Sequence, residues 1–156
     1  MTEYERLVDV VKKLRSEGGC PWDREQTHAS LKKHVIEEAC EVVAGINRLD
    51  KTGDPSNLQE ELGDVLFQVI MQAQIAAEEG LFNMEDVCRS AANKMVYRHP
   101  HVFGDSSVPK DIYAAWDELK KAEKKDENKA EALKYLGEAF SEGIDLINTA
   151  RERKGL

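Results

Sequence analysis

The chain has 156 residues, 41% of them hydrophobic, and a formal net charge of −8. This length and composition fit one globular domain with a hydrophobic core rather than a disordered chain. The negative charge argues against nucleic-acid coating, so no nucleic-acid polymer is expected as a partner. No apolar run reaches the ~18 residues of a membrane span, and the first residues are acidic, so we expect no membrane association and a cytoplasmic location.

The first predicted helix covers residues 3 to 17, where apolar side chains recur every three or four residues. A double glycine and Pro21 end the pattern, and a polar loop from residue 20 to residue 28 follows. Trp22 stands in this loop, either as an anchor packed on neighbouring helices or as a wall of a ligand pocket. The three cysteines are odd in number and none has C-x-x-C spacing, so neither a disulfide framework nor a zinc site is predicted.

Two blocks of acids follow, each inside an apolar helical pattern. The first helix is predicted from Thr27 or Ser30, either of which could cap it, to about Leu49. The second is predicted from residue 57 to residue 79, after a short turn-rich connection that makes the two helices antiparallel neighbours. Their acids can therefore face one another. The acids are Glu37, Glu38 and Glu41 in the first helix, and Glu60, Glu61 and Asp64 in the second.

These acids lie on or beside the apolar stripes of their helices, where an ordinary exposed charged residue would be unusual. Glu38 falls within the edge of the apolar stripe of the first helix, and Glu41 lies beside it. Glu61 and Asp64 fall between two apolar rows of the second helix. Carboxylates gathered on buried faces must take up protons, meet cations or bind a metal ion. A bound Mg²⁺ ion, or alternatively Mn²⁺, would best neutralise the repulsion among these carboxylates. The alternative interpretation is that they are ordinary exposed acids on a charged protein.

The helix predicted from residue 84 to residue 98 places Lys94 and Arg98 on one face. Two cations near a carboxylate cluster suit a polyanion such as a phosphate chain, although a solvated basic face would show the same spacing. Residues 99 to 105 contain two histidines, but their H-x-H spacing does not match a helical ligand pair. A structured turn is therefore predicted there rather than a metal site.

A short helix from residue 112 to residue 125 places Trp116 one turn from Lys120. Such a pair can stack on a base and touch a phosphate, or it can pack in the core. The last helix, from residue 129 to residue 153, is amphipathic. Its apolar face is expected to pack either on the helical bundle of the same chain or on another subunit. No strand or hairpin pattern is present, so an all-α antiparallel helical bundle is predicted.

Together these blocks resemble the MazG family of nucleoside triphosphate pyrophosphohydrolases. The family's E-E-x-x-E and E-x-x-D blocks correspond to residues 37–41 and 61–64. The resemblance extends to the C-P-W-D and H-P-H-V-F-G-D segments and covers roughly residues 3 to 125. We therefore predict a MazG-like domain for residues 1–125, and for residues 126–156 a C-terminal amphipathic helix that packs on the bundle or on a partner subunit.

The resemblance implies hydrolysis of a nucleoside triphosphate to a monophosphate and pyrophosphate, as in housecleaning of the nucleotide pool. Glu37 or Glu38 is the candidate for the general base. The residues that match the family's Mg²⁺ ligands are Glu38, Glu41, Glu61 and Asp64. Those that match its substrate contacts are Lys94 and Arg98 for the phosphates and Trp116 and Lys120 for the nucleotide.

Two positions depart from the family's pattern. Related enzymes often carry basic residues where this chain has His34 and Asn57, so weaker phosphate binding or a changed substrate choice is expected. Many relatives have two such domains, whereas this chain has one. Family members usually pair into dimers whose helices complete the site, so the resemblance implies a homodimer or a higher homo-oligomer.

Other functions are compatible with parts of the pattern. A non-catalytic regulator that binds nucleotide or metal would keep the fold, and the changes at His34 and Asn57 leave it open. A di-iron bundle is disfavoured because that class uses Glu-x-x-His pairs, which the acidic blocks here lack. A purely structural role for the bundle would not explain why acids lie on its apolar stripes.

Overall fold

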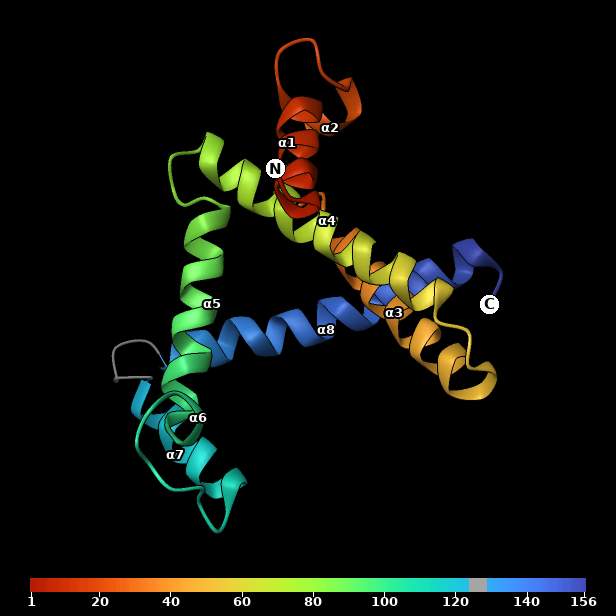
Figure 1. Ribbon diagram of the computed structural model, residues 1–156. Helices are drawn as coiled ribbons and strands as arrows, with labels where there is room; N and C mark the ends of the chain where they lie inside the picture. The colour runs from red at the N-terminus through yellow and green to blue at the C-terminus, as the bar shows by residue number, and fades with distance from the viewer. Residues whose placement is uncertain (124–128) are drawn as a thin grey trace. The chain divides into compact units, whose positions relative to one another are not determined.

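The computed structural model describes residues 1–123 and 129–156, and these residues form helices and no strand (Figure 1). The all-α prediction is therefore confirmed for this part of the chain. No helix within it is both long and apolar enough to cross a membrane. The helices are α1 (Glu3–Arg15), α2 (Pro21–Glu25), α3 (Lys32–Thr52), α4 (Ser56–Glu78), α5 (Met84–Arg98), α6 (Pro100–Phe103), α7 (Ile112–Glu123) and α8 (Lys129–Lys154).

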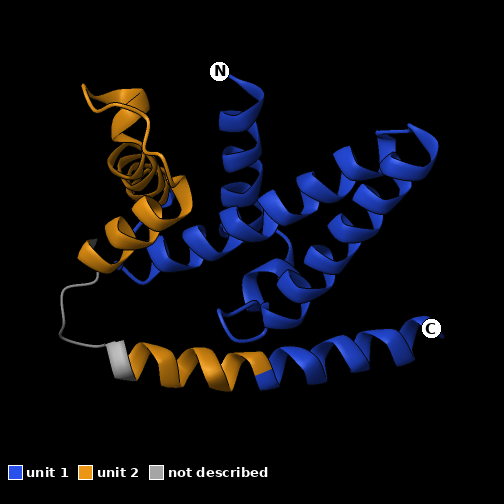
Figure 2. Ribbon diagram, turned by 90° about the horizontal axis from the view of Figure 1, so that it is seen from below, with its two compact units in different colours: residues 1–84, 141–156 blue, residues 85–140 orange. Residues whose placement is uncertain are grey.

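The chain forms two compact units, which Figure 2 colours separately. Unit 1 comprises residues 1–84 and 141–156, and unit 2 comprises residues 85–140. Helix α8 begins in unit 2 and ends in unit 1. The boundary predicted between residues 125 and 126 lies outside the described residues, so the division into a MazG-like domain and a C-terminal helix stays a prediction.

The centre of unit 1 is the antiparallel pair of α3 and α4 (Figure 1). Gly53 ends α3 with a left-handed φ of 74°, and its N–H donates to the Leu49 carbonyl at 2.8 Å. Glycine is favoured there because it has no Cβ. Gly45 lets the two helices approach closely, since a Cβ at this position would lie 2.9 Å from the Leu58 Cα. This pairing brings the two acidic segments opposite each other, as predicted.

The hydrophobic core of unit 1 lies where α1 packs on the second half of α4, beside the start of α3. Each large apolar side chain buried here contributes roughly 1.5–3 kcal/mol relative to exposure. The core therefore holds one end of the α3–α4 pair, and the acidic segments lie further along it. Its buried members are Val11, Leu31, Ile70, Met71 and Ile75.

The apolar stripe predicted for the first acidic helix is only partly buried. Leu31 is buried, but Val35 and Ile46 are exposed. On α4, Leu62 is 52% exposed. The expectation that the acids lie on buried faces is therefore only partly met within one chain, since Glu38 and Glu61 are half-buried and Asp64 is exposed. The reason is that these two helices cover only part of each other's circumference.

Arg15 ties the segment that follows α1 to the far end of α4. Its guanidinium donates to the backbone oxygens of Asp23 at 2.5 Å and Gln26 at 3.1 Å, and it binds the Glu78 carboxylate at 2.6 Å. The predicted polar loop in fact contains the short helix α2. Its first turn includes Pro21, where the fixed φ and the missing N–H of proline are tolerated.

In unit 2, α5 has the predicted bounds and α7 begins at the predicted residue. The structured turn predicted for residues 99–105 contains the one-turn helix α6. None of the residues of α5 is buried. The helical spacing of Val87, Ala91, Met95 and Val96 predicts that this row faces inward, but Met95 and Val96 are exposed, so for these two residues the prediction is wrong within this chain.

Candidate active site

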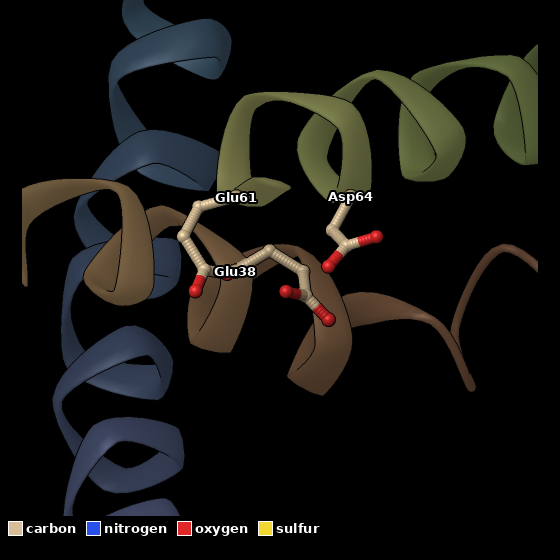
Figure 3. A group of neighbouring side chains, drawn as sticks. All are labelled: Glu38, Glu61 and Asp64. Atoms are coloured by element: carbon tan, nitrogen blue, oxygen red, sulfur yellow. The ribbon is translucent and has the colours of Figure 1, made fainter. Parts of the chain in front are cut away.

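Three carboxylates from α3 and α4 meet along the helix pair (Figure 3). One oxygen from each of Glu38, Glu61 and Asp64 lies within 4.8 Å of the other two. Glu38 comes from α3, whereas Glu61 and Asp64 lie three residues apart on one face of α4. Glu38 and Glu61 are half-buried and Asp64 is exposed. The structure thus brings together three of the four acids predicted to hold a metal ion.

The site concentrates negative charge. Burial raises the pKa of Glu38 to about 7, and a hydrogen bond with Glu41 and the neighbouring carboxylates act in the same direction. The raised pKa reflects the cost of ionising a half-buried carboxylate that also lies beside other carboxylates. Carboxylate oxygens at this spacing are the ligands that hard divalent cations prefer. The residues present therefore fit a divalent metal ion.

The C-terminal end of α8 contacts the other acids of the first block. The Lys154 ammonium binds Glu41 and lies 3.0 Å from Glu37 Oε1. Arg153 donates from Nη2 to both oxygens of Glu37 at 2.5 Å. The hydrogen bond from Lys154 is the largest cause that lowers the pKa of Glu37. Glu41 therefore neighbours Glu38 but lies outside the group of three, and its role as a fourth ligand stays a prediction.

Sequence reasoning missed both cations of α8, because a basic cluster near the end of an amphipathic helix is also typical of a plain helix terminus. It also missed the role of Asn57, which it treated only as a departure from the family. The Asn57 amide donates to Glu61 Oε1 at 2.7 Å, one turn along α4. The i, i+4 spacing could have signalled this contact. Glu60, the neighbouring acid, is exposed and lies outside the group.

Trp22 contacts α3 through His34. The two rings meet edge to face, with centroids 5.8 Å apart and an interplanar angle of 73°. Burial is the main cause that lowers the pKa of His34. The indole is 53% exposed, so it packs against the helix on one side and presents a free apolar surface beside it on the other.

Unit 2 brings together three of the four predicted substrate contacts. The Lys120 ammonium lies 4.2 Å from the centroid of the Trp116 ring, and the Arg98 guanidinium lies 5.9 Å from it. Lys94 lies one turn before Arg98 on α5 and is exposed. Arg98 and Trp116 also line a cavity of about 610 Å³ within this unit, together with His99. An aromatic ring flanked by cations can bind a base and a phosphate.

The helical architecture and the facing carboxylates define an all-α protein with a candidate site for a divalent metal. Residues 26–103, half of the chain, match the model of the MazG nucleotide pyrophosphohydrolase domain, and the chain belongs to this family. This match confirms the family predicted from the sequence.

Curated relatives agree with the assignment. The nucleoside triphosphate pyrophosphohydrolase/pyrophosphatase MazG of Thermotoga maritima is 50% identical over 121 residues, which are 78% of this chain and 45% of the relative. The nucleoside triphosphate pyrophosphohydrolase of Escherichia coli K12 is 41% identical over 136 residues, 85% of this chain and 50% of the relative. The uncharacterized protein YabN of Bacillus subtilis is 45% identical over 124 residues, 78% of this chain and 24% of the relative. The chain thus spans about a quarter to a half of the length of these relatives.

Proposed function

We propose that the protein hydrolyses nucleoside triphosphates to nucleoside monophosphates and pyrophosphate, as a housecleaning enzyme of the cytoplasmic nucleotide pool. The observation that carries the proposal is the convergence of Glu38, Glu61 and Asp64 within 4.8 Å in a chain of this family. The names of the Thermotoga and Escherichia relatives state the same activity for those proteins.

We propose Mg²⁺, or alternatively Mn²⁺, as the ion that this site holds. Glu38, Glu61 and Asp64 are its proposed ligands, with Glu41 as a fourth. When bound, such an ion neutralises charge on the phosphate chain and on the departing pyrophosphate. By holding the ion, the carboxylates of this chain would position the triphosphate, and the hydrogen bond from Asn57 orients Glu61 as a ligand.

In the proposed reaction, the oxygen of a water molecule bonds to the α-phosphorus and the bond between this phosphorus and the bridging oxygen breaks. Pyrophosphate leaves with that oxygen. Glu37 or Glu38 accepts the proton of the attacking water. Lys94 and Arg98 bind the phosphates and stabilise their charge, while Trp116 and Lys120 contact the nucleotide.

We further propose that the protein acts as a homodimer or a higher homo-oligomer. Support comes from the apolar side chains that one chain leaves exposed on the α3–α4 pair. They include Val35, Val43, Ile46, Leu62 and Val69. Large apolar side chains left exposed on two neighbouring helices are the kind of surface that a partner subunit would cover. The oligomeric state in solution, measured by light scattering, tests this part of the proposal.

The activity is tested with a panel of ribo- and deoxyribonucleoside triphosphates, with and without Mg²⁺, and identification of the products. Glu38→Ala and Asp64→Ala should each lose about 100-fold or more of the rate, the magnitude found when a charge-stabilising group is removed. Asp50→Ala is the matched control, because Asp50 is an exposed acid on α3 away from the site. Release of nucleoside diphosphate and orthophosphate would refute attack at the α-phosphorus.

A second candidate is a regulator that binds nucleotide or metal without turnover. The contacts of Lys154 and Arg153 with Glu41 and Glu37 favour it, because they occupy acids that catalysis would use. Metal-dependent nucleotide binding with no product from any member of the panel would establish the regulator and exclude the hydrolase.

A further inference from the structure

A cavity of about 300 Å³ lies between α3 and the C-terminal end of α8, and we call it the α3–α8 cavity. Both walls belong to unit 1, and Figure 2 draws this end of α8 in the colour of that unit. The two helices approach each other beside the cavity, where a Cβ on Gly143 would lie 3.9 Å from Ile36 Cδ1. Protein interiors contain few voids larger than a water molecule, so a gap of this size between neighbouring helices is suited to a ligand.

The cavity lies on the side of α3 that faces away from the converging carboxylates. Its α3 wall includes Ile36 and Cys40, and each of them is two residues from Glu38. Two residues correspond to about 200° around a helix, so these side chains point away from Glu38. The cavity is therefore distinct from the group of Glu38, Glu61 and Asp64.

The walls of the cavity are largely apolar. An apolar cavity of about 150 Å³ holds a molecule the size of benzene. The α3–α8 cavity is larger, so it accommodates an apolar body of about six to eight carbon atoms. The apolar and small side chains that line it are Ile36, Cys40 and Ala44 of α3 and Ile147 and Ala150 of α8.

The charged side chains at the cavity leave one cation without an acid. Lys154 binds Glu41 and lies 3.0 Å from Glu37, and all three residues line the cavity. Arg151 also lines it, but its exposed guanidinium forms no ion pair within the described part of the chain. A guanidinium binds carboxylates and phosphates through paired N–H donors. The cavity therefore suits a molecule with an apolar body and one anionic end.

We propose that the α3–α8 cavity binds a small amphipathic anion, with its apolar body between Ile36 and Ile147 and its charged end at Arg151. A carboxylate of medium chain length is the simplest ligand of this class. Lys154 lines the same cavity, so the bound anion competes with Glu41 for its ammonium group. Glu41 is then released for the metal ion, and the anion strengthens binding of the ion. This link with the metal rests on the proposed function, whereas binding of the anion does not.

The test titrates the full chain, isotope-labelled at the isoleucine δ1 methyl groups, with hexanoate and with hexanol. The two probes have similar apolar bodies and differ in charge. The methyl signals of Ile36 and Ile147 should shift in nuclear magnetic resonance spectra, whereas those of Ile70 and Ile75 in the hydrophobic core should not. Hexanoate should bind about fivefold more tightly than hexanol, the upper end of the effect of an exposed ion pair.

Arg151→Gln should remove this preference, so that the two probes bind equally. Lys134→Gln is the matched control, because Lys134 is an exposed cation on the same helix that does not line the cavity, and it should keep the fivefold preference. Ala150→Phe should fill the cavity and abolish binding of both probes. Ala44→Phe makes the same test from α3 if Ala150→Phe does not fold.

Equal affinities of the two probes for the unmodified protein would overturn the inference, and so would titrations in which the Ile36 and Ile147 signals do not move. Persistence of the fivefold preference in Arg151→Gln would also overturn it, because the anion would then bind elsewhere.

The link with the metal is tested by titration with Mn²⁺, with and without saturating hexanoate, followed by electron paramagnetic resonance. Hexanoate should tighten Mn²⁺ binding severalfold in the unmodified protein and leave it unchanged in Ala150→Phe, which excludes the probe. By linkage, Mn²⁺ should tighten hexanoate binding by the same factor. An Mn²⁺ affinity that does not respond to hexanoate would overturn the link with Glu41. Failure to bind Mn²⁺ at all would refute the proposed metal site, whereas the hexanoate titration decides binding of the anion on its own.

Discussion

Asn57 holds Glu61 through a hydrogen bond of 2.7 Å from its amide nitrogen to Glu61 Oε1. The contact is partly buried and joins two residues one turn apart on α4. It fixes one carboxylate of the three that converge, while the other oxygen of Glu61 stays available to a cation. Asn57 is therefore a positioning residue for the candidate metal site.

Asn57→Ala should weaken binding of Mn²⁺ by about tenfold, because loss of a residue that orients a ligand typically lowers metal affinity 10- to 100-fold. Titration with Mn²⁺ followed by electron paramagnetic resonance measures this without requiring turnover. Asn47→Ala, at an exposed position of α3, serves as the control. An unchanged affinity in Asn57→Ala would show that Glu61 is positioned by other contacts or does not bind the ion.

Lys154→Met should tighten metal binding severalfold. The Lys154 ammonium binds Glu41 and lies close to Glu37, so it competes with a divalent ion for the same negative charge. The gain should shrink at high salt, where exposed charges are screened. Arg151→Met is the control, since it removes a cation from the same helix end without these contacts. Weaker metal binding in Lys154→Met would mean instead that Lys154 orients Glu41 for the ion.

The ion pair of Arg15 and Glu78 should make stability depend on acid pH. A hydrogen bond from Arg15 is the main cause that holds the pKa of Glu78 below its usual 4.5 in the folded state. A lowered folded-state pKa stabilises the fold above the usual value, and this contribution is lost as the pH falls through the folded-state pKa. The thermal midpoints of the unmodified protein and Glu78→Gln should therefore differ at pH 7 and converge towards pH 3. Curves that stay parallel would contradict this prediction.

Gly45→Ala should destabilise the protein by about 1–3 kcal/mol, the usual cost of overpacking a close contact. A Cβ at this position would lie 2.9 Å from the Leu58 Cα, which is backbone and cannot rotate away. Chemical denaturation measures the change. A Cβ at Gly63 on α4 meets nothing within 4 Å, so Gly63→Ala should instead gain up to about 1 kcal/mol of helix propensity. Equal effects at the two positions would refute the close approach.

Local patterns predicted most of the helices and the group of facing acids. The helical periodicity placed α5 at its observed bounds and α4 within one residue at each end. The short connection made α3 and α4 antiparallel neighbours, and that alone brought Glu38 towards Glu61. These features depend on residues three or four apart or on a short loop, which a sequence displays directly.

Contacts between distant segments were not predictable in this way. Arg153 reaches Glu37 across 116 positions of the chain, and Arg15 reaches Glu78 across 63. Nothing in either local pattern distinguishes these cations from ordinary solvated ones. The predicted burial of the apolar stripe of α3 was also too high. Periodicity shows that a helix face is apolar, but it does not show whether other parts of the same chain cover that face.

The sequence by itself determined the all-α class, the order of the helices and the family, because periodicity and the spacing of the acids carry that information locally. Only the tertiary structure decided which polar atoms are paired. In it Asn57 binds Glu61 and Lys154 binds Glu41, whereas His34 Nε2 and Gln68 Oε1 have no hydrogen-bond partner among the described residues. Hydrogen bonding and burial depend on distances between helices, and those distances are fixed by packing at positions such as Gly45 rather than by the local pattern.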